Sequence, residues 1–87
     1  MNNVRRKEIK KSIAKLETVI SLIEEIAGDL ELIQEEEQEA FDNMPEGLQE
    51  SERGETMQEC IDSFDEILSV LNDEIDLTEI IEKLNEM

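Results

Sequence analysis

Apolar residues recur along the first part of the chain at alternating steps of four and three positions. This row contains Ile9, Ile13, Leu16, Ile20, Ile23, Ala27 and Leu30. A seven-residue period predicts an α-helix that buries one stripe against another helix. We expect this helix from about residue 3 to about residue 42, roughly 60 Å long at about 1.5 Å per residue. Gly28 lies inside it, where a glycine can kink a helix or permit close packing.

A second row of the same period lies in the last third of the chain. It contains Met57, Ile61, Phe64, Leu68, Leu71 and Ile75. The period then slips, and the apolar residues continue at shifted positions: Leu77, Ile80, Ile81, Leu84 and Met87. The sequence Asp76-Leu77-Thr78-Glu79 at the slip is a capping box, which is typical of a helix start. We expect a helix over residues 56–86, with either a break near residues 73–77 or a rotation of its buried face there.

The strongest break between the two rows is Asn43-Met44-Pro45-Glu46-Gly47-Leu48. Pro45 fits the first turn of a new helix, and Asn43 can cap that helix with Glu46 as its reciprocal partner. Gly47 and Gly54 weaken helix formation, so over residues 43–55 we expect a turn followed by an irregular segment or a short helical stretch. Two helices with a short connection form an antiparallel hairpin. The sequence thus predicts an all-α fold with two long helices, as one domain over residues 1–87.

Each predicted helix carries a second apolar row beside the first. These rows contain Val19, Leu22, Ile26 and Ile33 in the first helix and Ile67 and Val70 in the second. The combined stripe is wider than one partner helix covers, and exposed apolar strips of this kind mark association. A lone core is also marginal in a chain of this size. We therefore expect a homodimer of hairpins that forms a four-helix bundle.

Charge is distributed unequally along the chain. Residues 1–16 carry a net charge of +5 and residues 17–87 carry −22. We call the cationic residues of the first segment the basic block: Arg5, Arg6, Lys7, Lys10, Lys11 and Lys15. In a hairpin this block lies beside Glu79, Glu82 and Glu86, and the simplest interpretation is mutual compensation of their unfavourable positions on the helix dipoles. The alternatives are an arm that binds an external anion and a contact with another protomer.

Acidic residues recur on both helices at steps of three, four and seven. The first acidic row contains Glu17, Glu24, Glu31, Glu35, Glu39 and Asp42, and the second contains Glu55, Glu59, Asp62, Glu66 and Asp73. Like charges at these spacings repel by a few tenths of a kcal/mol per pair, whereas exposed helices commonly alternate Glu with Lys. A rod with carboxylate rows can occupy a groove that Lys and Arg line to receive DNA phosphates. The rows therefore predict binding to a basic protein surface; the alternative is a solvated face that serves solubility.

The residue types argue against catalysis, cofactors and specific metal sites. The chain has no histidine, and its three glycines are scattered rather than forming a phosphate loop. Cys60 precedes Ile61 on the apolar side of the second helix, so we interpret it as a small core residue. No segment matches the calcium-binding loop, and zinc or di-metal sites lack their histidine ligands. Direct nucleic-acid binding is not expected, because no Trp or Tyr supplies a stacking platform.

Charged residues also bear on location. Lys15, Glu17 and Glu24 interrupt the apolar positions that follow the basic block, so neither a signal peptide nor a membrane span is expected. The strong net negative charge disfavours an anionic lipid surface. A single cysteine cannot form an internal disulfide, and the default setting is the reducing cytoplasm.

The turn carries a further candidate contact site. Phe41, Met44 and Leu48 are apolar residues near the isolated Arg53. They can close the end of the bundle as a hydrophobic plug, or they can contact a partner. The surrounding segment, residues 35–54 (EEEQEAFDNMPEGLQESERG), is similar to a segment of helical proteins from phage-rich genomes. In size, acidity and helical character the chain resembles the anti-CRISPR and anti-restriction proteins of phages and mobile elements. This resemblance implies an inhibitor that imitates the charge of DNA in the host cytoplasm, and it transfers no site residue.

Three functions follow as hypotheses. The leading one is a non-catalytic binding protein that occludes a basic nucleic-acid-binding surface, plausibly on a bacterial defence enzyme. The second is a structural or assembly coiled coil of a phage or bacterium, in which the apolar strip is the working surface. The third is a sponge for a small ligand such as a nucleotide, with a pocket between protomers that is lined by Arg5, Arg6 and Lys10.

Overall fold

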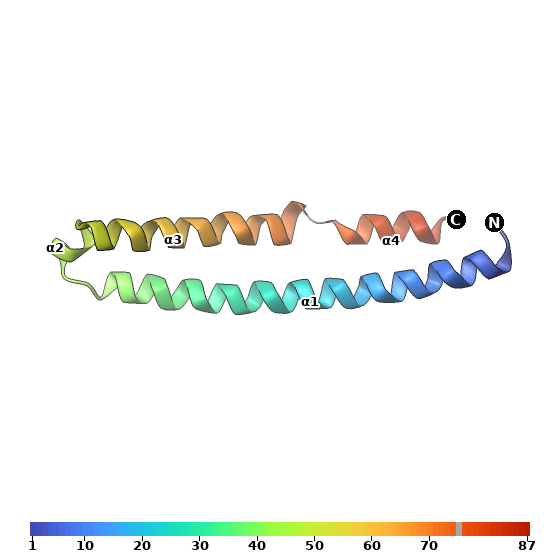
Figure 1. Cartoon of the computed structure of the whole chain (residues 1–87), viewed down its shortest axis with the longest axis horizontal. Helices are drawn as coiled ribbons and strands as arrows, with labels where there is room; N and C mark the ends of the chain where they lie inside the picture. Colours follow the sequence, from blue (N-terminus) through green and yellow to red (C-terminus); the bar gives the residue numbers. More distant parts are fainter. Residues whose placement is uncertain (75) are drawn as a thin grey trace.

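The chain folds back on itself once to form a long, thin hairpin. The computed structural model describes residues 1–74 and 76–87. In chain order the elements are α1 (Asn3–Asp42), α2 (Glu46–Gln49), α3 (Glu52–Ser69), the π-helical turn η1 (Val70–Glu74) and α4 (Leu77–Asn85). α3, η1 and α4 return beside α1, and the two termini lie at the same end (Figure 1). The principal extents are 68 × 16 × 13 Å, and the predicted antiparallel helical hairpin is confirmed for the described residues.

α1 has the predicted bounds, and side-chain and backbone contacts account for both of its ends. The side chain of Asn2 caps its start by accepting a hydrogen bond from the N–H of Arg5 at 2.9 Å. Asn43 caps its end, since the N–H of Asn43 donates to the carbonyl oxygen of Glu39. The prediction that Asn43 starts the next helix is therefore wrong: α2 follows Pro45 and has no side-chain cap. A Cβ at Gly28 would meet nothing within 4 Å, so Gly28 does not serve close packing.

The connection contains the short helical stretch that was one of the two alternatives. One turn of helix (α2) is followed by α3, which begins at Glu52 rather than at the predicted residue 56. Gly54 is buried, because its missing side chain lets the backbone of Gln49 lie against it. The Nε2 of Gln49 in turn donates to the carbonyl oxygen of Phe41 at 2.9 Å. These contacts tie α2 to both neighbouring helices and give the turn a defined shape.

The returning arm consists of two helices, so the prediction of two long helices in the chain needs correction. α3 passes into η1, and α4 begins at Leu77. The Oδ1 of Asp76 accepts a hydrogen bond from the N–H of Glu79 at 3.1 Å, which is one half of the predicted capping box. Of the two alternatives near residues 73–77, a break or a rotation of the buried face, the structure has the break. The core residues on either side of this break, Leu71 and Leu77, are six positions apart, one fewer than the period of seven, and both face α1. Ile75, predicted as a core residue, lies outside the described residues.

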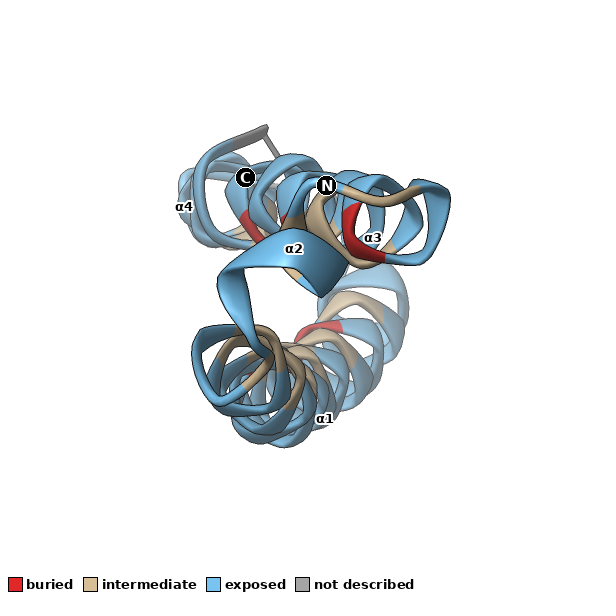
Figure 2. Ribbon diagram, turned by 90° about the vertical axis from the view of Figure 1, so that its left-hand side faces the viewer, coloured by how far each residue is buried: buried red, intermediate tan, exposed pale blue. Residues whose placement is uncertain are grey.

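The core is one line of contacts between the two arms. Ile13 and Ala27 of α1 and Ile61 and Leu68 of α3 are its buried apolar residues. Eleven further members of the predicted rows are half-buried: Ile9, Leu16, Ile20, Ile23, Leu30, Met57, Phe64, Leu71, Leu77, Ile81 and Leu84. Ile80 and Met87 of the shifted row are exposed instead. The buried and half-buried parts of the ribbons face the gap between the arms (Figure 2). The radius of gyration is 20.0 Å, whereas a compact chain of this length has about 12 Å. The hairpin alone therefore buries little apolar surface.

Candidate functional site

In both arms, the residues that directly follow the core residues lie on the same face of the hairpin. Gln34 of α1 donates through Nε2 to the Oδ1 of Asp65 on α3 at 2.6 Å. Residues that directly follow a core residue border two hollows between the arms: Glu24, Asn72 and Thr78 at one, and Lys10 and Asn85 at the other. Because residues seven positions apart lie on the same side of a helix, the residues that follow core positions occupy one face of the hairpin.

Most of the predicted acidic residues lie on this face, which we call the acidic face. Its carboxylates each follow a buried or half-buried residue: Glu17, Glu24, Glu31, Glu35, Asp42, Glu55, Asp62 and Asp65. All eight are exposed. Seven belong to the predicted acidic rows, and Asp65 joins them from outside those rows. The acidic face thus runs along α1 and α3.

Four residues of the predicted acidic rows do not join the acidic face. Glu39, Glu59 and Glu66 lie on the outer surfaces of α1 and α3, about half a turn away from the core rows. The reason is helical geometry: a step of four residues turns about 400°, so rows with repeated steps of four wind around the helix. Asp73 of the second acidic row is also off this face, and it borders the hollow at the break between η1 and α4.

The carboxylates of the acidic face have no cationic partner within 4 Å in the described chain. The ion pairs recorded there are Lys11–Glu8 at 3.2 Å and Lys83–Glu79 at 3.4 Å, and each joins exposed residues of a single helix. Pairs of this kind contribute about 0–1 kcal/mol. No described ion pair links the basic block to α4, so any compensation between them acts without direct contact.

The opposite flank of each core row is apolar, and we call it the apolar face. Its members each precede a core residue: Val19, Leu22, Ile26, Ile33, Cys60, Ile67, Val70 and Ile80. The seven aliphatic side chains are 41–51% exposed, so the hairpin leaves the predicted second apolar row uncovered. Cys60 is also exposed, and its predicted core role is wrong. Ile61 takes the buried position, and Cys60 lies one step around the helix, beside a shallow groove of about 230 Å³ with Phe64 and Ile67.

The apolar residues at the turn are covered unequally. Phe41 and Met44 are half-buried, whereas Leu48 is 48% exposed and Arg53 is exposed. Phe41 and Met44 lie in positions that suit a plug at this end of the hairpin, and Leu48 does not.

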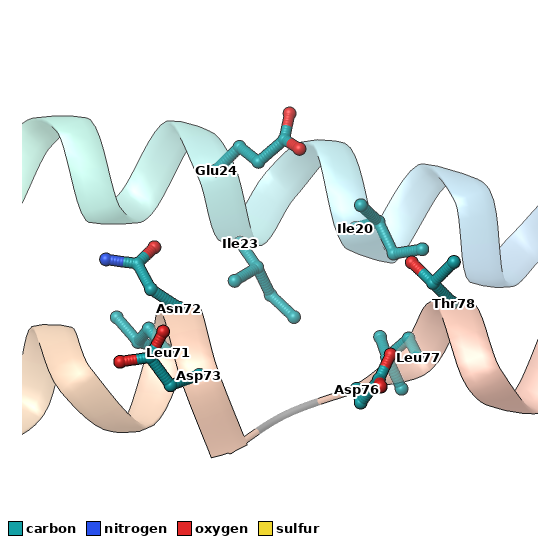
Figure 3. Close-up of a pocket in the computed structure, with 9 residues that line it drawn as sticks. All are labelled: Ile20, Ile23, Glu24, Leu71, Asn72, Asp73, Asp76, Leu77 and Thr78. Atoms are coloured by element: carbon teal, nitrogen blue, oxygen red, sulfur yellow. The ribbon is translucent and has the colours of Figure 1, made fainter.

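A hollow of about 410 Å³ lies at the break between η1 and α4 (Figure 3). Ile20 and Ile23 of α1 point across it toward the returning arm, while the carboxylate of Glu24 points away from that arm. The remaining lining residues are Leu71, Asn72, Asp73, Asp76, Leu77 and Thr78. In the described part of the chain no three His, Cys, Asp or Glu side chains are grouped to hold a metal ion. The hollow therefore provides polar walls without a recognisable coordination site.

A smaller groove of about 240 Å³ lies between the start of α1 and the end of α4. Arg6 and Lys10 of the basic block border it, together with apolar residues such as Ile13 and Leu84. Arg5, expected beside them in a ligand pocket, is not among its lining residues.

Sequence reasoning missed the side chains that fix the pairing of the arms. Gln34 comes four positions after Leu30, where the repeat requires a core residue, so its polar character at that step was the available signal. Gly54 and Gln49 had no comparable signal, because their contact depends on how α2 folds back on α3.

Within residues 1–74 and 76–87, none of the helices combines the length and apolar character needed to cross a membrane. Comparisons of the chain with protein-family models, curated proteins and solved structures give no match.

Proposed function

We propose that this chain is a non-catalytic binding protein whose acidic face covers a cationic surface on a partner protein that handles nucleic acid. The observation that supports this most directly is the alignment of exposed carboxylates along one face, without a cationic partner in the described chain. A surface with this much unneutralised charge attracts cations over long range. The net charge of −17 keeps other anions, including nucleic acids, away.

The proposed mechanism is occlusion without turnover. Glu17, Glu24 and Glu31 are seven residues apart, which corresponds to about 10.5 Å along a helix. Lys and Arg rows that receive the evenly spaced phosphates of DNA can meet such a series. Binding would relieve part of the repulsion among the carboxylates, and complementary charge would speed the encounter. The resemblance of residues 35–54 to phage-associated proteins makes a bacterial defence nuclease the partner that we favour.

The test uses two variants with the same change in charge. The triple variant Glu17→Lys, Glu24→Lys and Glu31→Lys alters the acidic face. Its control, Glu39→Lys, Glu59→Lys and Glu66→Lys, alters the outer surfaces. A partner is first captured from the native host with the unaltered chain and identified by mass spectrometry. The face variant should then bind it at least tenfold more weakly than the control does.

Competition and salt complete this test. Duplex DNA should displace the chain from its partner, and affinity should fall steeply up to 0.5 M salt, because exposed charges are screened. Equal weakening by the two triple variants, or a complex indifferent to DNA, would defeat the proposal.

A second candidate is an assembly module that works through its apolar face. The seven half-exposed aliphatic side chains favour it, since contiguous exposed apolar surface marks association sites. Apolar association is not weakened by salt, so a partner retained at 0.5 M salt, such as a capsid or tail component, would support this candidate.

The proposed role of the acidic face is compatible with self-association, and we propose that the hairpin forms a homodimer, a four-helix bundle joined through the apolar face. Light scattering should give twice the chain mass of 10.1 kDa across a micromolar dilution series. A constant mass of one chain would contradict it.

A further inference from the structure

We propose that the second copy lies antiparallel on the apolar face, with the turn of one hairpin over the termini of the other. The inference rests on the homodimer proposed above and adds its geometry. In this arrangement the two-fold axis crosses the face near Ile26, and α1 of one copy packs against α1 of the other. The pairing of Gln34 with Ile61 and Asp65 sets the register of the two arms, so the same axis passes near Val70.

The exposed row of α1 on this face is complementary to its own reversal. At steps of three and four it reads Ser12, Lys15, Val19, Leu22, Ile26, Asp29, Ile33, Glu36 and Ala40, and all nine residues are exposed. Reversal about Ile26 brings together positions whose numbers add up to about 52. Ile26 then meets its own copy. On either side of it Val19 meets Ile33, and farther out Ser12 meets Ala40. Apolar residues thus come opposite apolar ones, and small residues opposite small ones.

Two of the three charged positions of this row match in the same way. Reversal places Lys15 of one copy opposite Glu36 of the second copy, and the two-fold axis repeats this pair at the other end. In this arrangement no two like charges of the row come opposite each other. Opposite charges in facing helices set orientation and register, as they do in coiled coils.

Charge over the whole hairpin favours the same orientation. Residues 1–16 and 76–87, which form the end with the termini, carry a net charge of +2, and residues 17–75 carry −19. An antiparallel copy places each cationic end over the strongly anionic turn half of the other hairpin. A parallel copy would stack the two anionic halves on each other, and like charges at this proximity repel.

The amount of uncovered apolar surface calls for a partner of this size. Seven aliphatic side chains that are each about half exposed amount to on the order of several hundred Å², near the largest apolar patch that a monomer usually leaves open. The hairpin buries only four apolar residues in the described chain. A second apolar face of the same length would cover this patch.

One step of the row does not match, and it provides a specific test. Leu22 of one copy comes opposite Asp29 of the second copy, so a carboxylate lies in an otherwise apolar part of the interface. The substitution Asp29→Leu should therefore tighten the dimer at least tenfold in sedimentation equilibrium. No change, or a weaker dimer, would contradict the register.

Spin labels test the orientation directly. In the variant Glu50→Cys with Cys60→Ser, the label is attached at the exposed turn, away from the apolar face. In an antiparallel dimer the two turns lie at opposite ends of a bundle about as long as the hairpin, 68 Å, and pulsed electron resonance should place the labels more than about 50 Å apart. In a parallel dimer they would lie within about two helix diameters, roughly 25 Å. The shorter distance would overturn the antiparallel arrangement.

Matched substitutions test the face. Ile26→Glu should convert the dimer to a monomer with unchanged helix content by circular dichroism. Leu32→Glu, on the outer surface of the same helix at a site 61% exposed, should leave the dimer intact. Loss of the dimer in both variants, or in neither, would refute the assignment of the face.

A charge exchange tests the pairing. Lys15→Glu and Glu36→Lys should each weaken the dimer severalfold, and the double variant should recover affinity. If the double variant were weakened by the sum of the two single effects, the pair would be refuted.

A chain that is monomeric in all variants would end the dimer proposal and this arrangement. Binding of a cationic partner by the acidic face would be unaffected and can be measured separately.

Discussion

The side-chain amide of Gln34 joins the two arms of the hairpin by donating to the carboxylate of Asp65 at 2.6 Å and to the carbonyl oxygen of Ile61 at 3.1 Å. Gln34 occupies a core position in α1, four residues after the apolar core residue Leu30. A polar residue at one core position selects the register in which its hydrogen bonds are made. This residue therefore fixes how α3 is aligned with α1, and with it the composition of both faces.

Substitutions at Gln34 test how much its hydrogen bonds contribute to the free energy of unfolding. Gln34→Ala should lower the free energy of unfolding by about 1 kcal/mol, because two hydrogen bonds of a half-buried group are lost. Gln34→Leu should keep or raise that free energy, since an apolar residue fills the core position. Urea denaturation measures both variants. An unaltered midpoint for Gln34→Ala would show that the amide does not contribute.

Gly28→Ala should stabilise the protein by about 0.5–1 kcal/mol, because alanine reduces the conformational entropy of the unfolded chain and favours the helix. The site is open on the exposed side of α1, with no atom within 4 Å of a built Cβ. Thermal unfolding followed by circular dichroism should show a higher midpoint. A lower midpoint would reveal a structural role for the glycine.

Gly54→Ala should have the opposite effect. A Cβ at this position would overlap the backbone carbonyl of Gln49, so the turn must shift, at a cost of about 1–3 kcal/mol. Gly47→Ala is the matched control, because a Cβ at Gly47 meets nothing within 4 Å. Both variants are measured in the same thermal assay. An equal midpoint for Gly54→Ala and Gly47→Ala would contradict the structure of the turn.

Asp76→Ala should loosen α4 selectively. The Asp76 carboxylate accepts the N–H of Glu79, and loss of such a cap costs about 1 kcal/mol. Hydrogen exchange should accelerate in residues 77–85 and remain unchanged in α1 near the turn. Asp76→Asn keeps an acceptor and should behave like the unaltered chain. Uniform acceleration along the whole chain would instead indicate a global role for this cap.

Much of the fold was predictable because it depends on local periodicity. The row from Ile9 to Leu30 gave the bounds of α1, and the capping sequence at Asp76 indicated where the second arm breaks. These features were predictable because a helix repeats every 3.6 residues and its first turn needs side-chain acceptors. The uncovered second row was foreseen for the same reason.

The errors arose where the outcome depends on contacts between segments. Cys60 was expected in the core, but the pairing with α1 gave that place to Ile61. The second helix was expected to start at residue 56, but α3 begins at Glu52, where Gly54 packs against the backbone of Gln49.

The sequence by itself determined the helices, the hairpin and the excess of negative charge, because each follows from residue order within a few turns. The tertiary structure alone decided which flank of each helix faces which way. Glu31 and Asp65 lie on one face and Ile26 and Ile67 on the other because both arms are locked in a single register. That register depends on contacts across 31 positions of sequence, as between Gln34 and Asp65, and no local repeat encodes it.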